Sequence, residues 1–410
     1  MGSAPAGTDR PAHRDGNVLR WLGAYTSSMI GDNVYYLALS WAAVQAGTPS
    51  QAGLVMAVSA VPRALLMLGG GVVADRFGPR KVVIGSDAVR CAAVLAVAAL
   101  LFATDPGLWP LALLAVVFGT VDAVFMPAVG ALPARVTGHG QLARVQGMRG
   151  LAIRFANVVG APLGGLAVAL GGSATAFGLA GLLIAVSVPL LISVRTRELP
   201  ADDKTAERTA WRDLRDGLGY IRRHRVLAPL IAAIALGDFG FVGPLNVGLT
   251  LLTDQRGWGA AGMGWVVAGF GTGAGAAALL LTVRGHLPHA GRVAGVAILG
   301  GSVAIGALAY APSVAAAVGV ALLVGLLAGL SGALCGALLQ THADPAYLGR
   351  VTAVAGLASL GLAPLSMPVA AAAIGWWGTG PVFVASAAVC GLGGVLALCV
   401  RDLRRAELPR

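Results

Sequence analysis

Residues 71–81 read GVVADRFGPRK, a segment in which one acidic residue, Asp75, is followed by three basic ones. Apolar runs at 51–74 and 82–103 lie on either side of this charged point. A helix needs about 20 apolar residues to cross the roughly 30 Å hydrocarbon core of a bilayer, and both runs are long enough. The segment therefore predicts a short charged loop between two membrane-spanning helices.

Composition independently excludes a water-soluble protein. Hydrophobic residues make up 57% of the 410 residues, charged residues make up only 11%, and there are 60 glycines. The mean hydropathy is +0.80. Too few polar side chains remain to cover a soluble globule of this length, so we predict an all-α membrane protein.

The apolar runs predict twelve transmembrane helices. The first 18 residues are polar and have no apolar region of their own, so we expect a cytoplasmic tail and no cleavable signal peptide. The twelve predicted spans are 19–44, 51–74, 82–103, 109–134, 147–170, 174–194, 227–251, 259–283, 293–310, 315–341, 351–373 and 380–400.

Basic residues gather on one side of the predicted membrane. An even number of crossings puts both termini on the same side, and the tails and loops of that side hold most of the 29 Lys and Arg residues. Such loops are typically cytoplasmic, so we expect both termini in the cytoplasm. The net charge of +11 then reflects topology and attraction to anionic lipids, and nucleic-acid binding is not needed to explain it. The strong preference for Arg over Lys indicates a GC-rich bacterial genome, and hence the inner membrane.

The chain repeats itself with a constant offset of 206 residues. Asp32 returns as Asp238, and Pro162 returns as Pro368. Matches at one offset along several helices predict two pseudo-symmetric six-helix bundles, with a substrate site near the midplane between them. The predicted parts are a tail at 1–18, an N-terminal bundle at 19–194, a cytoplasmic linker at 195–225, a C-terminal bundle at 226–400 and a tail at 401–410. Apolar residues at helical spacing in the linker, among arginines, predict an amphipathic helix on the inner membrane surface; a solvated linker is the alternative.

The 71–81 segment resembles the signature loop between the second and third helices of the major facilitator superfamily. Twelve helices in two halves extend this resemblance to nearly the whole chain. Within the superfamily the chain looks most like the drug:proton antiporter branch, which holds macrolide-efflux-like and siderophore-exporter-like proteins. The narrower match is carried by Gly31–Asp32, Pro62–Arg63, Asp122 with Pro127, and residues 348–368. The resemblance implies a monomer that works by rocker-switch alternating access.

The resemblance also implies a conformational latch on the inner side of the membrane. Asp75 would meet the amino end of a helix in the other half, where a carboxylate gains about 0.3 to 2 kcal/mol. Gly349 and Arg350 mark the expected docking point. For Arg80 the alternative is a plain anchor at the lipid surface. The predicted latch set is Gly71, Asp75, Arg76, Gly78, Arg80, Gly349 and Arg350.

A predicted hinge lies in the fifth helix, which reads GAPLGG over residues 160–165. This element is similar to the G-P-x-x-G-G element of antiporters, although the proline is displaced by one position and Ala156 stands where the family has Gly. Proline and paired glycines allow a kink and close helix approach, which is also common in membrane helices generally. The predicted hinge residues are Gly160, Pro162, Gly164 and Gly165.

Charged residues near the centres of predicted helices are the sharpest functional signal, because each costs a few kcal/mol there and needs a partner or a task. Asp32, Arg63, Asp122 and Asp238 occupy such positions. We predict proton coupling by Asp32, with Asp122 as the next candidate, and an ion pair between Asp32 and Arg63 that opens and closes. The alternative is a permanent ion pair that serves packing alone. Asp238 is the predicted substrate-selecting acid.

Other polar and aromatic residues are assigned by position. Asp87, Arg90, Arg149 and Arg154 lie within about three turns of the inner surface, so we expect them to snorkel or pair there. Aromatic residues would give the cavity walls suited to amphipathic molecules. Besides Asp238, the predicted substrate-binding set is Tyr35, Tyr36, Phe125, Phe239, Asn246 and Gln340.

The sequence offers no signal of enzyme chemistry. Neither lysine stands in a G-K-[ST] context, no nucleophile motif is present, and the histidines lack partners for a metal site. We therefore expect no cofactor and no metal, and as partners a small molecule, protons and lipid. The leading hypothesis is a proton-coupled exporter of an antibiotic, another drug or a siderophore. The alternatives are an importer or facilitator of a nutrient or siderophore, and a transporter-like sensor without flux.

Overall fold

The computed structural model describes residues 14–59, 62, 63, 66, 73, 76–104, 107–138, 141–197, 210–284, 289–344, 347–357, 359 and 365–407. Throughout these ranges the chain is helical, without strands. Eight described helices are long and apolar enough to cross a membrane. Together with the shorter and broken helices they follow the predicted spans wherever these are described, so the all-α prediction is confirmed.

The first half contains five described helices, of which the last covers two predicted crossings. Helix α6 loses helical geometry at Gly171 and Gly172, where Gly172 has φ +75°. A positive φ is open to glycine at little cost, so this pair separates the fifth crossing from the sixth. The helices are α1 (Gly16–Ala46), α2 (Pro49–Val58), α4 (Pro79–Ala103), α5 (Trp109–Val136) and α6 (Leu142–Ser193).

The second half begins after the amphipathic helix α7 (Ala210–Arg223). Its first crossing is interrupted by a π-helical turn at Pro244–Gly248, a feature that often marks functional sites. The remaining elements are α8 (Leu227–Gly243), α9 (Leu249–Gln255), α10 (Gly259–Arg284), α11 (Ala290–Leu308), α12 (Val314–His342), α13 (Leu348–Leu357), α14 (Ser366–Trp377), α15 (Thr379–Cys399) and α16 (Arg401–Arg404).

Local signals in the sequence set several helix starts. Thr48 and Gln51 form a capping box at the start of α2, in which side chain and backbone bond each other reciprocally. Asp15 accepts the backbone N–H of Asn17 at 2.8 Å and caps α1. Gly78 has φ +84° directly before α4, a conformation that would strain a residue with a side chain.

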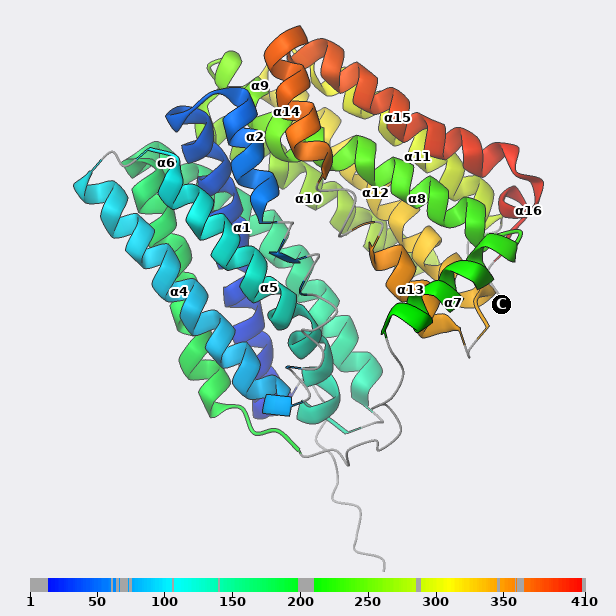
Figure 1. Ribbon diagram of the computed structural model, residues 1–410, viewed down its shortest axis with the longest axis horizontal. Helices are drawn as coiled ribbons and strands as arrows, with labels where there is room; N and C mark the ends of the chain where they lie inside the picture. Colours follow the sequence, from blue (N-terminus) through cyan, green and yellow to red (C-terminus); the bar gives the residue numbers. More distant parts are fainter. Residues whose placement is uncertain are drawn as a thin grey trace, which may run out of the picture.

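The two bundles lie side by side and touch at one end (Figure 1). At that end a methyl group added to Gly53 of α2 would overlap Ala371 of α14. On the other flank, Gly165 of α6 approaches α10 so closely that an added Cβ would lie 2.5 Å from the carbonyl oxygen of Ala260. Glycine permits this approach of backbones. The offset of 206 relates Gly165 to Ala371. The contact between α6 and α10 is therefore the equivalent, in the repeat, of the contact between α14 and α2.

Polar contacts between α1 and the α8–α9 segment close the same end. The hydroxyls of Ser40 and Thr250 lie 2.5 Å apart and are buried. The amide of Gln45 donates to the carboxylate of Asp254 at 2.9 Å. Helix α7 lies at the opposite end, where the bundles diverge (Figure 1). The structure is therefore closed at the end remote from α7.

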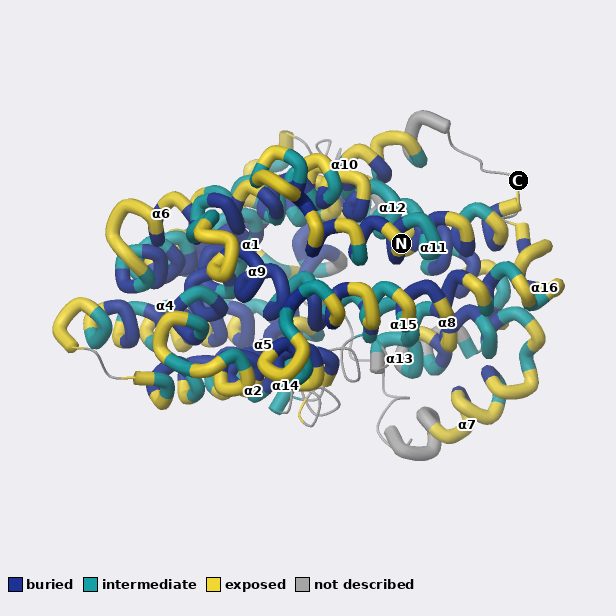
Figure 2. The backbone as a smooth tube through the Cα atoms, turned by 90° about the horizontal axis from the view of Figure 1, so that it is seen from above, coloured by how far each residue is buried: buried dark blue, intermediate teal, exposed yellow. Residues whose placement is uncertain are grey.

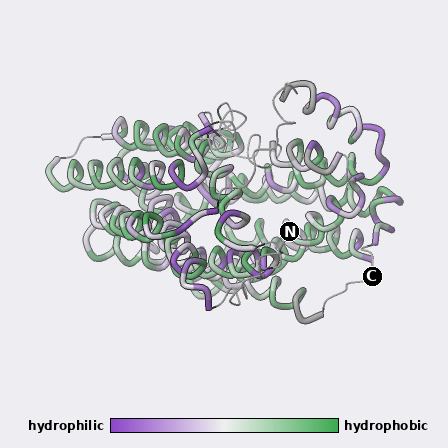
Figure 3. Tube along the Cα trace, turned by 90° about the horizontal axis from the view of Figure 1, so that it is seen from below, coloured by the Kyte–Doolittle hydropathy of each residue, from purple (hydrophilic) through white to green (hydrophobic). Residues whose placement is uncertain are grey.

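Buried residues follow the inward faces of the helices, and exposed residues follow their outer faces (Figure 2). Many exposed positions are large and apolar, including Leu170, Val303 and Trp376. Apolar residues also predominate along most helices (Figure 3). An outer surface of this kind matches lipid tails, and water would disfavour it.

Candidate functional site

A cluster of charged side chains is buried inside the first bundle, around Arg90 of α4. Its Nη1 atom lies 2.9 Å from Oδ2 of Asp32 in α1 and 3.5 Å from Oδ1 of Asp122 in α5. Its Nη2 atom donates to Asp87, one turn earlier in α4. The Arg90 side chain has no exposed surface. One guanidinium group thus joins three carboxylates from three helices.

Neighbouring groups divide the three acids into two kinds. Asp87 is 1% exposed and accepts hydrogen bonds from the hydroxyls of Ser28 and Ser187. Asp32 and Asp122 keep 14% and 11% of their side-chain surface exposed. The hydroxyl partners of Asp87 hold it beside Arg90, whereas the side chains of Asp32 and Asp122 remain partly accessible.

Asp122 has two further partners. The hydroxyl of Tyr36 donates to its Oδ2 atom at 3.2 Å, and Nη1 of Arg63 lies 3.7 Å from the same oxygen. The ring of Phe125 lies against the Arg90 guanidinium, 3.9 Å from ring centre to Cζ. Such a cation–π contact favours the charged guanidinium in a dry interior.

The predicted pairing of Asp32 with Arg63 is wrong, since Arg63 contacts Asp122 and Arg90 contacts Asp32. Of the two roles expected for Arg90, snorkelling and pairing, the structure shows pairing, with Asp32, Asp87 and Asp122. Helix α4 begins at Pro79, so Arg90 lies eleven residues, or about 16 Å, along it. Three helical turns from the surface is already the middle of a hydrocarbon core about 30 Å thick.

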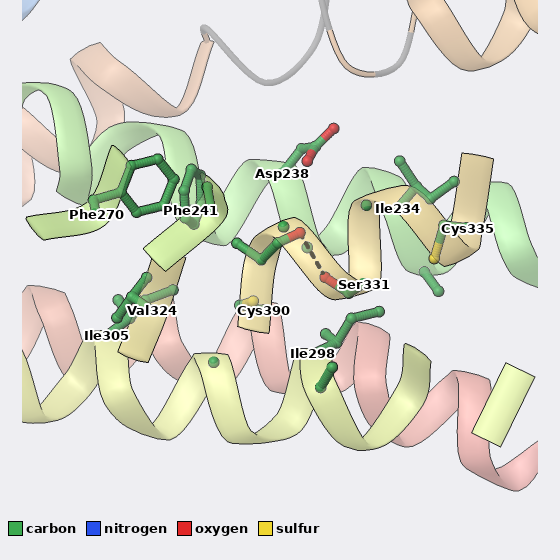
Figure 4. Close-up of a pocket in the computed structure, with 18 of the residues that line it drawn as sticks. Ile234, Asp238, Phe241, Phe270, Ile298, Ile305, Val324, Ser331, Cys335 and Cys390 are labelled. Atoms are coloured by element: carbon green, nitrogen blue, oxygen red, sulfur yellow. Dashed lines mark hydrogen bonds between the residues drawn. The ribbon is translucent and has the colours of Figure 1, made fainter. Parts of the chain in front are cut away.

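A cavity of about 360 Å³ lies among α8, α10, α11, α12 and α15 of the second bundle, and Arg154 and Asn157 of α6 line it from the first bundle. Its walls are mostly apolar, with Phe241 of α8 and Phe270 of α10 next to each other at a centroid distance of 5.6 Å (Figure 4). Asp238 of α8 lines it, as predicted for a substrate-selecting acid, and its Oδ2 accepts from Ser359 at 2.5 Å. Arg154 reaches the same cavity from α6 of the other bundle. This size and lining are typical of a small-molecule site.

Several predicted substrate-binding residues lie elsewhere. Tyr35 is fully buried and stacks on Phe118 at 3.7 Å between centroids, and Phe125 packs on Arg90, so both are core residues. Phe239 lines a separate pocket of about 200 Å³ against α14 and α15. Gln340 is exposed on α12.

Asn246 and Tyr36 lie close to functional positions without lining the main cavity. The Asn246 amide donates to Val242 within the π-turn region at 2.8 Å, and the residue lines a small pocket of about 150 Å³ that shares Phe241 and Phe270 with the cavity. Tyr36 belongs to the charged cluster through Asp122. Among the cavity residues that sequence reasoning did not assign to substrate are Arg154, Asn157 and Phe270.

The predicted latch can be followed only in part, because Gly71 and Asp75 lie outside the described residues. Arg80 donates to the carbonyl oxygens of Leu191 and Ile192 near the end of α6 and so ties α4 to α6. The set's described members Arg76 and Gly78 lie at the start of α4, Gly349 lies in α13, and Arg350 packs against Gly217 of α7.

The predicted hinge segment makes close helix contacts. A Cβ at Gly160 would lie 2.6 Å from that of Asn33 in α1, and Gly164 lies near the backbone of Val34. Pro162 and Gly165 face Gly264 of α10. The pronounced break of α6 comes later, at Gly171–Gly172.

Two six-helix bundles, with buried charges in the first and a cavity in the second that the first also lines, define a multi-pass membrane transporter. The chain belongs to the Major Facilitator Superfamily, whose family model matches residues 21–360. It is 26% identical over 362 residues to the enterobactin exporter EntS of Shigella boydii, covering 87% of this chain and 84% of that protein. The same protein of Escherichia coli O139:H28 matches equally.

Solved structures show the same fold at low sequence identity. A bacterial homolog of the human lysosomal transporter Spinster, in an inward-facing and occupied conformation, superposes with a TM-score of 0.73 at 14% identity and full coverage of both chains. A D-xylose-proton symporter gives a TM-score of 0.70 at 14% identity, covering 96% of this chain and 98% of that one.

Proposed function

We propose that the chain is a proton-coupled exporter of small amphipathic molecules in a bacterial inner membrane, with both termini in the cytoplasm. The observation that carries the proposal is the buried cluster around Arg90. Its three carboxylates, Asp32, Asp87 and Asp122, face only two guanidinium groups, those of Arg90 and Arg63. One negative charge is therefore unbalanced in a buried setting.

Burial of an unbalanced charge costs several kcal/mol, and a carboxylate can avoid this cost by taking up one proton. The partly exposed side chains of Asp32 and Asp122 favour them as the proton-carrying sites, with Asp32 as the first candidate. Release of the proton restores the attraction between Asp32 and Arg90. The cluster thus has two charge states, and opening the protein to one side of the membrane or the other can select between them.

The closed end of the structure is the outer end if the termini are cytoplasmic. Ser40–Thr250 and Gln45–Asp254 then seal the outside, and the cavity with Asp238 opens inward. Rocking of the two bundles would open these contacts and close the α7 end. An exporter binds its substrate from the cytoplasm in the inward-open state and takes up protons from outside in the outward-open state.

The direction rests on the relatives. The curated relatives are named enterobactin exporters and match along most of this chain, which favours export over uptake. Import is the second candidate, because a structure of similar fold is a D-xylose-proton symporter. A small-molecule substrate, protons and lipid are the partners in either case, and we expect a monomer without enzyme activity.

Proton release from everted, acid-inside vesicles tests the proposal. A panel of antibiotics, dyes and siderophores is added to vesicles with wild-type protein, Asp32→Asn and the control Asp216→Asn, which alters an exposed acid of α7. We expect at least one compound to release protons with wild type and control, and none with Asp32→Asn. A compound that binds the protein but moves no protons in wild-type vesicles would overturn antiport and favour uncoupled transport.

A further inference from the structure

The cavity of about 360 Å³ is lined by one acidic and one basic side chain, and they come from different halves. Asp238 belongs to α8 of the second bundle, and Arg154 belongs to α6 of the first. We propose that the substrates are zwitterions: amphipathic molecules with an ammonium group for Asp238, a carboxylate or similar anion for Arg154, and an apolar body for Phe241 and Phe270. The inference rests on the proposed function only in taking this cavity as the substrate site.

Arg154 is poised for a ligand because none of the described residues satisfies it. In the described part of the chain its guanidinium takes part in no ion pair and no hydrogen bond. Arg90, by comparison, contacts three carboxylates, and Arg63 contacts one. A cation that lines a largely apolar cavity and lacks a partner is a ready site for an anionic group.

Asp238 is only partly satisfied. It accepts one hydrogen bond, from the hydroxyl of Ser359, and no cation of the described residues lies within ion-pair distance. A carboxylate can accept about four hydrogen bonds, so capacity remains for an ammonium group. The rest of the wall is mostly apolar, including Ile234, Ile298 and Val324 (Figure 4).

Closure of the cavity decides between ligand classes. When the α7 end closes, water leaves, and each charge then needs a partner or becomes costly. A monocation would satisfy Asp238 but leave Arg154 unpaired and repelled by the ligand. A monoanion would do the reverse. A zwitterion satisfies both, and because the two charges lie on opposite bundles, it also draws the bundles together.

Binding of a matched ligand series tests the inference without any need for transport. Nε-dansyl-lysine is a fluorescent zwitterion of suitable size; its methyl ester is a monocation, and its Nα-acetyl derivative is a monoanion. Each is titrated against the full chain in lipid nanodiscs. We expect the zwitterion to bind at least about tenfold more tightly than either analogue, since a charge-assisted hydrogen bond contributes on this scale.

Two substitutions make the test specific. Asp238→Asn should bind the zwitterion and the monoanion equally well but should still prefer the zwitterion to the monocation. Arg154→Gln should bind the zwitterion and the monocation equally well but should still prefer the zwitterion to the monoanion. Asp216→Asn and Arg215→Gln, matched changes at exposed positions of α7, should alter neither ratio. These crossed ratios are insensitive to a general loss of folding, which would weaken all three ligands alike.

Equal binding of the ester and the zwitterion to wild type, wild-type preference ratios in both variants, or no binding of any of the three ligands up to 1 mM would each overturn the inference. Because the readout is binding, failure of proton coupling in vesicles would leave these ratios unchanged, and the two proposals fail separately.

Discussion

Nη1 of Arg90 lies 2.9 Å from Oδ2 of Asp32, and this pair connects α4 to α1 in the middle of the first bundle. Because Arg90 also contacts Asp87 and Asp122, a single side chain links the charges of three helices. The second bundle has one acid, Asp238, at the position equivalent to Asp32, and no arginine of the described residues forms an ion pair with it. The two halves therefore share a fold and differ in their chemistry.

Arg90→Gln should destabilise the protein strongly. The change leaves buried carboxylates without their cation, and breaking a buried pair in this way costs about 3–5 kcal/mol. Arg63→Gln is the matched control, because Arg63 is 20% exposed and lies 3.7 Å from Asp122, so its loss should cost much less. Thermal unfolding in nanodiscs measures both. Equal Tm values for the two variants would contradict a central role for Arg90.

Twelve crossings and two related halves could be predicted from the sequence because length, hydropathy and the 206-residue offset are properties of the chain alone. The offset also relates Ser40 to Asn246, and the structure brings these two residues together: the Ser40 hydroxyl donates to the Asn246 carbonyl oxygen at 3.4 Å. Equivalent residues meet in this way where two related bundles face each other across their symmetry axis.

Side-chain direction could not be predicted. Position along a helix identifies Asp32, Asp122 and Asp238 as midplane charges, but it gives no rotation about the helix axis. The sequence therefore predicts Arg63 as the partner of Asp32, whereas in the structure the partner is Arg90. Tyr35 likewise points into the core. An aromatic residue in a helix can face cavity, core or lipid, and one sequence cannot separate these cases.

Gly53→Leu should open the outer end. The added side chain would overlap Ala371, and overpacking of this kind costs about 1–3 kcal/mol, which shifts an equilibrium between closed and open states by about 5- to 150-fold. Gly178→Leu is the control, since an added Cβ there meets no atom within 4 Å. The rate at which an impermeant thiol reagent labels Ser40→Cys from outside, in a cysteine-free background, reports opening. Unchanged labelling in Gly53→Leu would show that α2 and α14 do not hold the outer end closed.

Gly165→Val and Pro162→Ala should separate packing from hinge motion in α6. A side chain at Gly165 would press on the backbone of α10, so we expect a shift towards the outward-open state similar to that of Gly53→Leu. Pro162→Ala removes a possible kink and leaves the contact, so transport should stay within about twofold of wild type if packing is the main role. A larger loss in Pro162→Ala than in Gly165→Val would support the hinge instead. Substrate-driven proton release measures both.

His224 should make the stability of the α7–α8 junction depend on pH. Its Nδ1 accepts the backbone N–H groups of Val226 and Leu227 at 3.2 Å each, which only the neutral ring can do. Burial lowers the pKa of His224 below its usual 6.5, and His342 lowers it further. The unfolded chain therefore binds the proton more readily, so this stabilisation is complete above pH 6.5 and is lost as pH falls through the folded pKa. The fall in Tm between pH 8 and pH 5 should be larger for wild type than for His224→Asn, whereas His289→Asn, at an exposed position, should behave like wild type. An equal fall in all three proteins would show that His224 does not cap α8 in its neutral form.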